Sequence, residues 1–202
     1  VVFSSLFFLC VFLPLNLILY YVIKNRTYRN WLLIITSLLF YAWGEPVWVM
    51  LLIFSTLFDY YNALIAGRNR GNWKGKAALV ISVAGNLIIL GFFKYSGFIV
   101  DNLNSLLGTE LQIASFGLPI GISFYTFQTI SYVVDVYRGE TDAQPSFFKL
   151  LLFVSLFHQL VAGPIVRYKD IAGEIEHRVE TPEQFNYGVS RFIMGLGKKV
   201  LI

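Results

Sequence analysis

Residues 118–139 read LPIGISFYTFQTISYVVDVYRG, and this stretch sets the conditions that the fold has to meet. It is apolar enough for a membrane helix, yet it carries Gln128, Ser131, Asp135 and a row of tyrosines. At about 100° per residue, one narrow helical stripe collects Gly117, Gly121, Phe124, Gln128, Ser131 and Asp135, with Tyr132 beside it. An unpaired polar group in lipid is costly, so the stripe must face protein or a water-filled cavity. A hydrogen-bonded helix contact and a substrate path both meet this condition.

The first turn of the same helix is expected to pack closely against a neighbour. Gly117 and Gly121 form a Gly-x-x-x-Gly pair, which lets a second helix approach. Pro119 is expected to kink this turn.

The composition places the chain in a membrane. Of the 202 residues, 56% are hydrophobic and only 14% are charged, whereas soluble domains average about 25% charged residues. A single cysteine, Cys10, excludes an internal disulfide, and no group of residues has the spacing of a metal site. The net charge of +4 does not call for a nucleic-acid partner.

Hydropathy predicts an all-α, polytopic integral membrane protein with about six to seven membrane helices, as a single domain over 1–202. The expected spans are 1–23, 31–43, 47–66, 77–93, 116–137 and 147–163, with another helix from 182. The apolar segment that begins there stops at Ile202 without a cap, so we expect the chain to be the N-terminal part of a longer protein.

The connecting segments alternate in charge. Basic residues occupy 24–30 and 67–76, while Glu45 is the only charge between the second and third spans, and 94–115 is mixed. Basic loops favour the cytoplasm, so the N-terminus is expected outside a bacterial inner membrane and 138–146 inside it.

The chain after residue 147 predicts a broken or re-entrant element. Gly163-Pro164 should end a helix of about 16 residues near 162, and Arg167 should lie at the mouth of the break. His158 and Gln159 precede it in an apolar run. Residues 168–180 suit a short interfacial helix, and Thr181, Pro182 and Gln184 form a capping-box pattern.

Asp59 is unusual in the same way as the polar residues of 118–139, because it lies well inside an apolar span. An intramembrane acid marks either a functional site or a paired structural site. Its possible partners are Lys94, Arg138 and Arg167. A direct role for His158 in proton transfer and a structural role both fit the sequence.

Five stretches in order resemble the membrane-bound O-acyltransferase family, in particular its branch of alginate O-acetyltransferase membrane subunits. They are VVFSSLFFLCVFLPLNLILYY, TSLLFYAWGEP, LPIGISFYTFQTISYVVDVYRG, QLVAGPIVRY and GLGKKVLI. The resemblance covers essentially the whole chain. One departure is His158, where relatives have proline.

The resemblance implies an enzyme that passes an acyl group, typically acetyl, through a central tunnel. The donor would be cytoplasmic, such as acetyl-coenzyme A, with no bound cofactor. The acceptor would be an extracytoplasmic polysaccharide or cell-wall polymer, reached through partner acetyltransferase or acceptor proteins. The family's catalytic histidine belongs to a Trp-His-Gly-type segment after GLGKKVLI, so it is expected beyond Ile202. The predicted tunnel residues are Gln128, Ser131, Tyr132, Asp135, Arg138, His158, Gln159 and Arg167.

Two other functions remain open at this stage. Intramembrane Asp59 and Asp135 with a broken helix are also typical of a transporter or channel. A segment without the catalytic histidine could instead be an inactive, partner-binding fragment.

Overall fold

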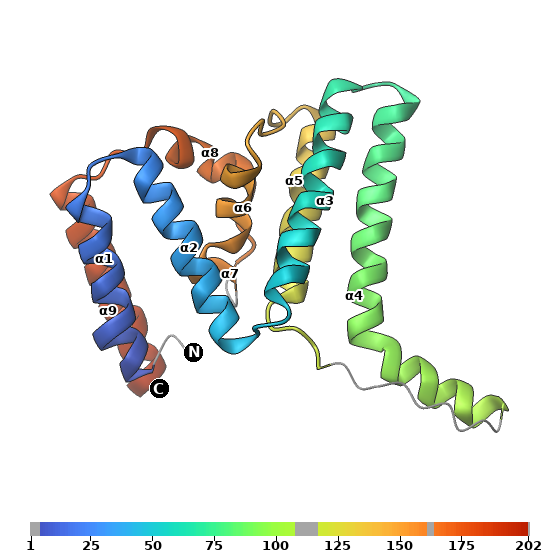
Figure 1. Ribbon diagram of the computed structural model, residues 1–202, viewed down its shortest axis with the longest axis horizontal. Helices are drawn as coiled ribbons and strands as arrows, with labels where there is room; N and C mark the ends of the chain where they lie inside the picture. Colours follow the sequence, from blue (N-terminus) through green and yellow to red (C-terminus); the bar gives the residue numbers. More distant parts are fainter. Residues whose placement is uncertain (1–4, 108–116, 161–163, 202) are drawn as a thin grey trace. The chain divides into compact units, whose positions relative to one another are not determined.

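The computed structural model describes residues 5–107, 117–160 and 164–201, and every regular element in them is a helix (Figure 1). The chain divides into two compact units, one formed by 1–32 with 171–202 and the other by 33–170. The boundaries fall inside α2 (Arg26–Gly44) and α8 (Tyr168–His177). The all-α prediction is confirmed for the described residues.

The unit 33–170 is built on three helices, α3 (Val49–Arg68), α4 (Trp73–Leu107) and α5 (Ile122–Arg138). Each packs against the other two, and α6 (Phe147–Ser155) packs against α3 and α5. α3 matches the predicted span 47–66 within two residues. Fully buried side chains of the unit come from α3, α5 and α6 and include Leu52, Tyr125, Tyr132 and Phe153.

α2 and α4 are longer than the sequence predicted. α2 begins at Arg26 and not near residue 31, because the side chain of Asn25 accepts a hydrogen bond from the Tyr28 N–H (3.2 Å) and starts the helix early. α4 continues to Leu107, so the expected connection 94–115 was wrong for residues 94–107. The isolated charged residues of this segment are compatible with an exposed helix. Figure 1 shows this end of α4 turning away from α3.

The start of α5 also corrects the sequence analysis. Gly121 is the N-cap residue and has φ 77°, a left-handed conformation that strongly favours glycine. Gly117 and Pro119 therefore precede the helix, and the Ile122 N–H bonds the Pro119 carbonyl in a turn (3.2 Å). The Gly-x-x-x-Gly packing pair and the proline kink were wrong, because the stripe is helical only from Ile122.

In the unit 1–32 with 171–202, a π-helical turn η1 (Phe8–Phe12) leads into α1 (Leu13–Val22), and α9 (Pro182–Leu201) lies beside α1 (Figure 1). The rings of Tyr21 and Phe185 meet edge to face at 5.9 Å between these two helices. The interfacial helix predicted over 168–180 is α8, which ends at His177.

The predicted capping box is confirmed at the start of α9. The Gln184 N–H donates to the Thr181 hydroxyl (3.2 Å), and the Gln184 side-chain oxygen accepts from the Thr181 N–H (3.2 Å). Both N–H groups would otherwise lack a partner at the helix end.

Two helices of the described residues, α3 and α4, are long and apolar enough to cross a membrane. The helix Phe8–Val22 is also apolar but shorter.

Replacing the cap in Thr181→Ala should lower the free energy of unfolding by about 1 kcal/mol, because one end of the box is lost. Ser190→Ala, an exposed change within α9, is the matched control and should have little effect. Denaturant unfolding of the full-length protein in detergent measures both. Equal stabilities would contradict the assignment of the cap.

Candidate functional site

Leu156 interrupts the helix that was expected to run from 147 to about 162. α6 ends at Ser155, Leu156 has φ −48° and ψ 116°, and α7 (Phe157–Leu160) then begins. A broken element is therefore present, but its position differs from the prediction. The predicted break at Gly163-Pro164 falls partly on 161–163, which lie outside the described residues.

Side chains from two other helices satisfy the backbone groups freed at this break. The Phe157 N–H donates to Ser37 Oγ of α2 (3.2 Å), whereas in a continuous helix it would donate to the Phe153 carbonyl. The Phe153 carbonyl accepts instead from Gln128 Nε2 of α5 (3.3 Å) and from Gln159 Nε2. An apolar surrounding tolerates a helix break only with such substitutes. Ser37 was missed because nothing in its local sequence marks it.

Gln128 and Gln159, both predicted, thus meet at one carbonyl. They also line a cavity of about 10 Å³, which is completed by Phe124, Pro164, Ile165 and Val166. This volume suits a single water molecule and not an acyl group. His158 is exposed, and its ring lies edge-on against Phe157 at 5.5 Å.

At the other end of α5, Asp135 forms an ion pair with Arg167. Arg167 Nη2 lies 2.7 Å from Asp135 Oδ1, and the carboxylate is fully buried while the guanidinium is 41% exposed. The second oxygen, Oδ2, has no hydrogen-bond partner among the described residues. Arg138 is the last residue of α5 and is exposed, and no ion pair among the described residues joins it to Asp135.

Glu140 and Lys169 extend this charged cluster to the surface. Lys169 Nζ lies 2.7 Å from Glu140 Oε2, and Arg167 Nη1 lies 3.7 Å from the same oxygen. The hydrogen bond and charge of Lys169, with Arg167 and Arg138 nearby, hold the pKa of Glu140 below its ordinary value. Arg167 is therefore shared between a buried and an exposed carboxylate.

Asp59 is fully buried and has neutral partners. Ser82 Oγ donates to Asp59 Oδ1 (2.6 Å), and Asn86 Nδ2 lies 2.8 Å from both carboxylate oxygens. The expected partners Lys94, Arg138 and Arg167 were wrong, since no ion pair among the described residues includes Asp59. The two partners lie one turn apart on α4, a spacing that could have indicated them. Asp59 thus joins α3 to α4.

The remaining predicted side chains of α5 make local contacts. The Tyr132 hydroxyl accepts the Gln144 N–H (2.8 Å), and its ring meets Tyr168 at 4.9 Å. Ser131 Oγ donates to the Gln128 carbonyl of its own helix (2.8 Å). Tyr132 therefore anchors the loop after α5, and Ser131 turns back onto the backbone.

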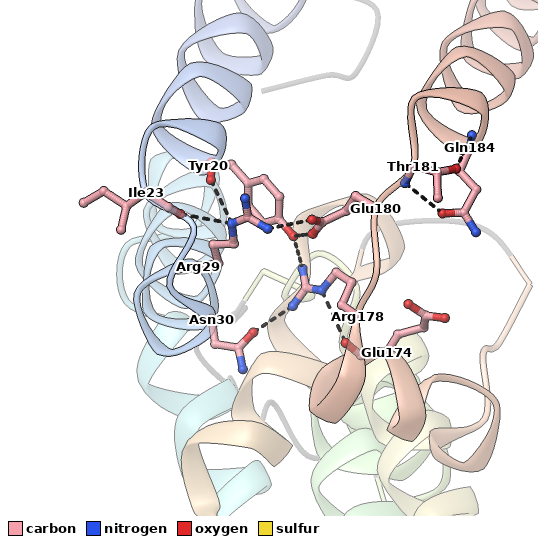
Figure 2. A network of polar contacts seen from close by, with 9 residues as sticks. All are labelled: Tyr20, Ile23, Arg29, Asn30, Glu174, Arg178, Glu180, Thr181 and Gln184. Atoms are coloured by element: carbon pink, nitrogen blue, oxygen red, sulfur yellow. Dashed lines mark hydrogen bonds and ion pairs between the residues drawn. The ribbon is translucent and has the colours of Figure 1, made fainter.

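A polar network of the unit 1–32 with 171–202 was not predicted (Figure 2). Glu180 accepts a hydrogen bond from the Tyr20 hydroxyl and forms an ion pair with Arg29 Nη1 (2.6 Å). Arg178 donates to the Tyr20 hydroxyl (2.9 Å) and to Asn30 Oδ1 (2.7 Å). The network fixes the corner before α9 to the corner between α1 and α2. Its members lie about 150 positions apart, so no local pattern reveals it.

Burial by itself would raise the pKa of Glu180. The hydrogen bonds from Tyr20 and Arg29, and the charges of Arg29 and Arg178, outweigh burial and hold the pKa below its ordinary value.

The Ser37 hydroxyl should stabilise the break measurably. Ser37→Ala removes the hydrogen bond to the buried Phe157 N–H and should lower the free energy of unfolding by about 1–3 kcal/mol. Ser55→Ala is the matched control, because Ser55 is a buried helical serine whose Oγ has no hydrogen-bond partner among the described residues. Denaturant titration of the two variants compares them, and an equal loss would contradict the role of Ser37.

The Glu180 network should respond to acid. A carboxylate with a lowered folded pKa stabilises the fold above its unfolded pKa, about 4.3, and this stability is lost as pH falls through the lower folded value. Stability of the wild type should therefore fall more steeply below about pH 5 than that of Glu180→Gln. Glu183→Gln, with an exposed carboxylate, should retain the wild-type slope. Parallel pH profiles for wild type and Glu180→Gln would refute the network.

The chain is similar to known proteins over its whole length. It is 43% identical over 214 residues to a probable alginate O-acetylase AlgI of Pseudomonas aeruginosa, and 42% over 206 residues to that of Azotobacter vinelandii. A peptidoglycan O-acetyltransferase of Helicobacter pylori is 31% identical over 233 residues. These alignments cover 100%, 100% and 99% of this chain and 39%, 41% and 44% of the relatives.

The chain thus spans about two fifths of the length of these relatives. No family profile and no solved structure matches it. Identity at this level from end to end shows that the chain is homologous to part of these O-acetyltransferases, in agreement with the resemblance of its five sequence stretches to the membrane-bound O-acyltransferases.

Proposed function

We propose that the full-length protein is a membrane O-acetyltransferase that moves an acetyl group from a cytoplasmic donor to a hydroxyl of an extracytoplasmic polysaccharide or cell-wall polymer. This chain would supply part of the passage between the two sides. The lipid bilayer, the acyl donor and extracytoplasmic acceptor proteins would be its partners.

Similarity to enzymes named for two different polymers is the observation that carries this proposal. Alginate and peptidoglycan differ in their sugars, but both offer hydroxyl groups for acetylation. The chain matches both kinds of relative over essentially its entire length. The shared part is therefore best explained by acetyl transfer itself, and the identity of the polymer stays open.

The contacts at the helix ends support the expected topology of the unit 33–170. Arg70, after α3, donates to the carbonyls of Val136 (2.9 Å) and Thr141 (2.8 Å), at the end of α5. Segments 67–76 and 138–146, both expected in the cytoplasm, thus lie together. At the opposite end, Tyr41 of α2 donates to the Ile120 carbonyl (2.9 Å). In the orientation with a basic cytoplasmic side, the N-terminus lies outside, and the membrane crossed is the bacterial inner membrane.

The charged cluster would form the cytoplasmic entrance. Arg167 is 41% exposed and held by Asp135, so its free N–H groups can meet the phosphates of a donor such as acetyl-coenzyme A. Arg138 and Lys169 add positive charge nearby. Gln128 and Gln159 would form a polar wall further along α5, with the rest of the passage supplied by other parts of the full-length protein.

The transfer step needs a base that takes the proton of the acceptor hydroxyl as its oxygen attacks the acyl carbonyl and the thiolate leaves. Neither His158 nor His177 belongs to a Trp-His pair. We therefore assign the base to a family histidine outside these 202 residues and give this segment a role in positioning. On its own, the segment would be inactive.

Gln128→Leu and Asp135→Asn in the full-length protein should each lower the acetylation rate about tenfold or more, which corresponds to about 1.4 kcal/mol in the barrier. Phe127→Leu changes an exposed side chain of the same helix and is the matched control. The measurement is transfer of labelled acetyl from acetyl-coenzyme A to polymer in proteoliposomes, normalised to folded protein. Unchanged turnover in both site variants would refute the passage through α5.

The same proteoliposomes test the function itself. Donor-dependent acetylated polymer supports the enzyme. Uptake of a solute without covalent change would support a carrier instead, the class that buried Asp59 and a broken helix also suit.

A further inference from the structure

A long groove separates α1 from α9, within the unit 1–32 with 171–202. Its volume is about 640 Å³, well within the range of pockets that hold small molecules. The apolar lining consists of Leu13, Leu17 and Tyr21 from α1 and Phe185, Val189 and Phe192 from α9. Most of these side chains are more than one third exposed, so the two helices meet without filling the space between them.

Gly188 keeps the middle of the groove open. It lies on the groove wall of α9, and a Cβ added there would meet no atom within 4 Å. A larger residue at this position would fit the backbone but fill the groove. Gly195 has the same freedom of space and does not line the groove, so it provides a matched position on the same helix.

Polar residues occur at one end of the groove, where α1 ends and α9 begins. They are Glu174, Arg178, Glu180 and Gln184. Glu180 is already neutralised by Arg29. Glu174 gives only its backbone carbonyl to the network in Figure 2, and its exposed carboxylate lies apart from the other side chains. Arg178 makes three hydrogen bonds, and its guanidinium has five N–H donors.

The groove is therefore complementary to an amphiphile. Its lining is apolar along most of its length, and one end carries both a positive and a negative side chain. Arg178 can bind a phosphate through its remaining N–H groups, and Glu174 can accept hydrogen bonds from an ammonium group. A head group with only negative charge would be repelled by the Glu174 carboxylate. An uncharged head group would form an ion pair with neither Arg178 nor Glu174. Charge complementarity therefore selects a head group that contains both phosphate and a primary ammonium.

We propose that the groove between α1 and α9 binds a phospholipid of the ethanolamine type, with one acyl chain along the apolar lining, its phosphate at Arg178 and its ammonium at Glu174. The residues of this site are not those of the proposed passage along α5, and lipid binding does not depend on acyl transfer. Binding would fill an apolar surface that helix packing leaves open.

The test is native mass spectrometry of the full-length protein after exchange into mixed micelles that contain phosphatidylethanolamine, phosphatidylcholine or phosphatidylglycerol. The wild type should retain one phosphatidylethanolamine at least about tenfold more strongly than the other two lipids, a difference of about 1.4 kcal/mol. Gly188→Leu should lose that lipid, whereas Gly195→Leu should retain it. Equal retention in the two glycine variants would overturn the proposal.

Glu174→Gln tests the head group without filling the groove. It should remove the preference for phosphatidylethanolamine over phosphatidylcholine, because the quaternary ammonium of choline has no N–H to donate. Glu183→Gln, which does not line the groove, should keep the preference. A preference unchanged by Glu174→Gln would exclude the ammonium contact.

A photo-crosslinking side chain at Val189 identifies the occupant directly. An adduct with the mass of a phospholipid is expected. A crosslink to another segment of the same chain, or to a second copy, would show that protein covers the groove and would overturn the lipid site. This result is independent of whether the glycine variants fold well, and a protein that binds the lipid but transfers no acetyl would refute only the proposed function.

Discussion

A broken helix among apolar neighbours leaves one carbonyl and one N–H without partners, and the unit 33–170 depends on supplying them. Ser37 of α2 accepts a hydrogen bond from the Phe157 N–H, and Gln128 of α5 donates one to the Phe153 carbonyl. Three segments far apart in the chain are thereby held at one point. The buried Asp59 links α3 and α4 by the same means, through Ser82 and Asn86. In this unit hydrogen bonds between helices specify which helix neighbours which, while apolar burial alone would accept several arrangements.

The sequence predicted those features that local chemistry determines. The capping box at Thr181, the limits of α3 and the burial of Gln128 and Asp135 were all visible in short stretches. The end of α4 was not, because Lys94 and Asp101 looked like loop residues although single charges can extend from an exposed helix. The start of α5 was missed because a glycine at helical spacing can equally be an N-cap.

The sequence predicted which residues belong to the candidate site, but it did not predict which of them contact one another. Gln128, Gln159, Asp135 and Arg167 were all singled out, and the structure brings them together in two pairs. Periodicity places side chains on one face of one helix, but it carries no information about which other helix meets that face. The sequence therefore could not show that Arg167 is the partner of Asp135. Leu156 breaks its helix without glycine or proline, and its cause lies in α2 and α5.

The ion pair between Arg29 and Glu180 has a consequence for the order of events during synthesis. Arg29 belongs to a basic segment of the kind that orients a chain at insertion, and its partner is made 151 residues later. Until residue 180 has been synthesised, Arg29 therefore lacks its acidic partner in the network. Only after the ribosome has added Glu180 is that charge neutralised. Arg29 thus carries a single charge early in synthesis and belongs to an ion pair in the finished fold, so the same side chain meets different electrostatic surroundings at the two stages.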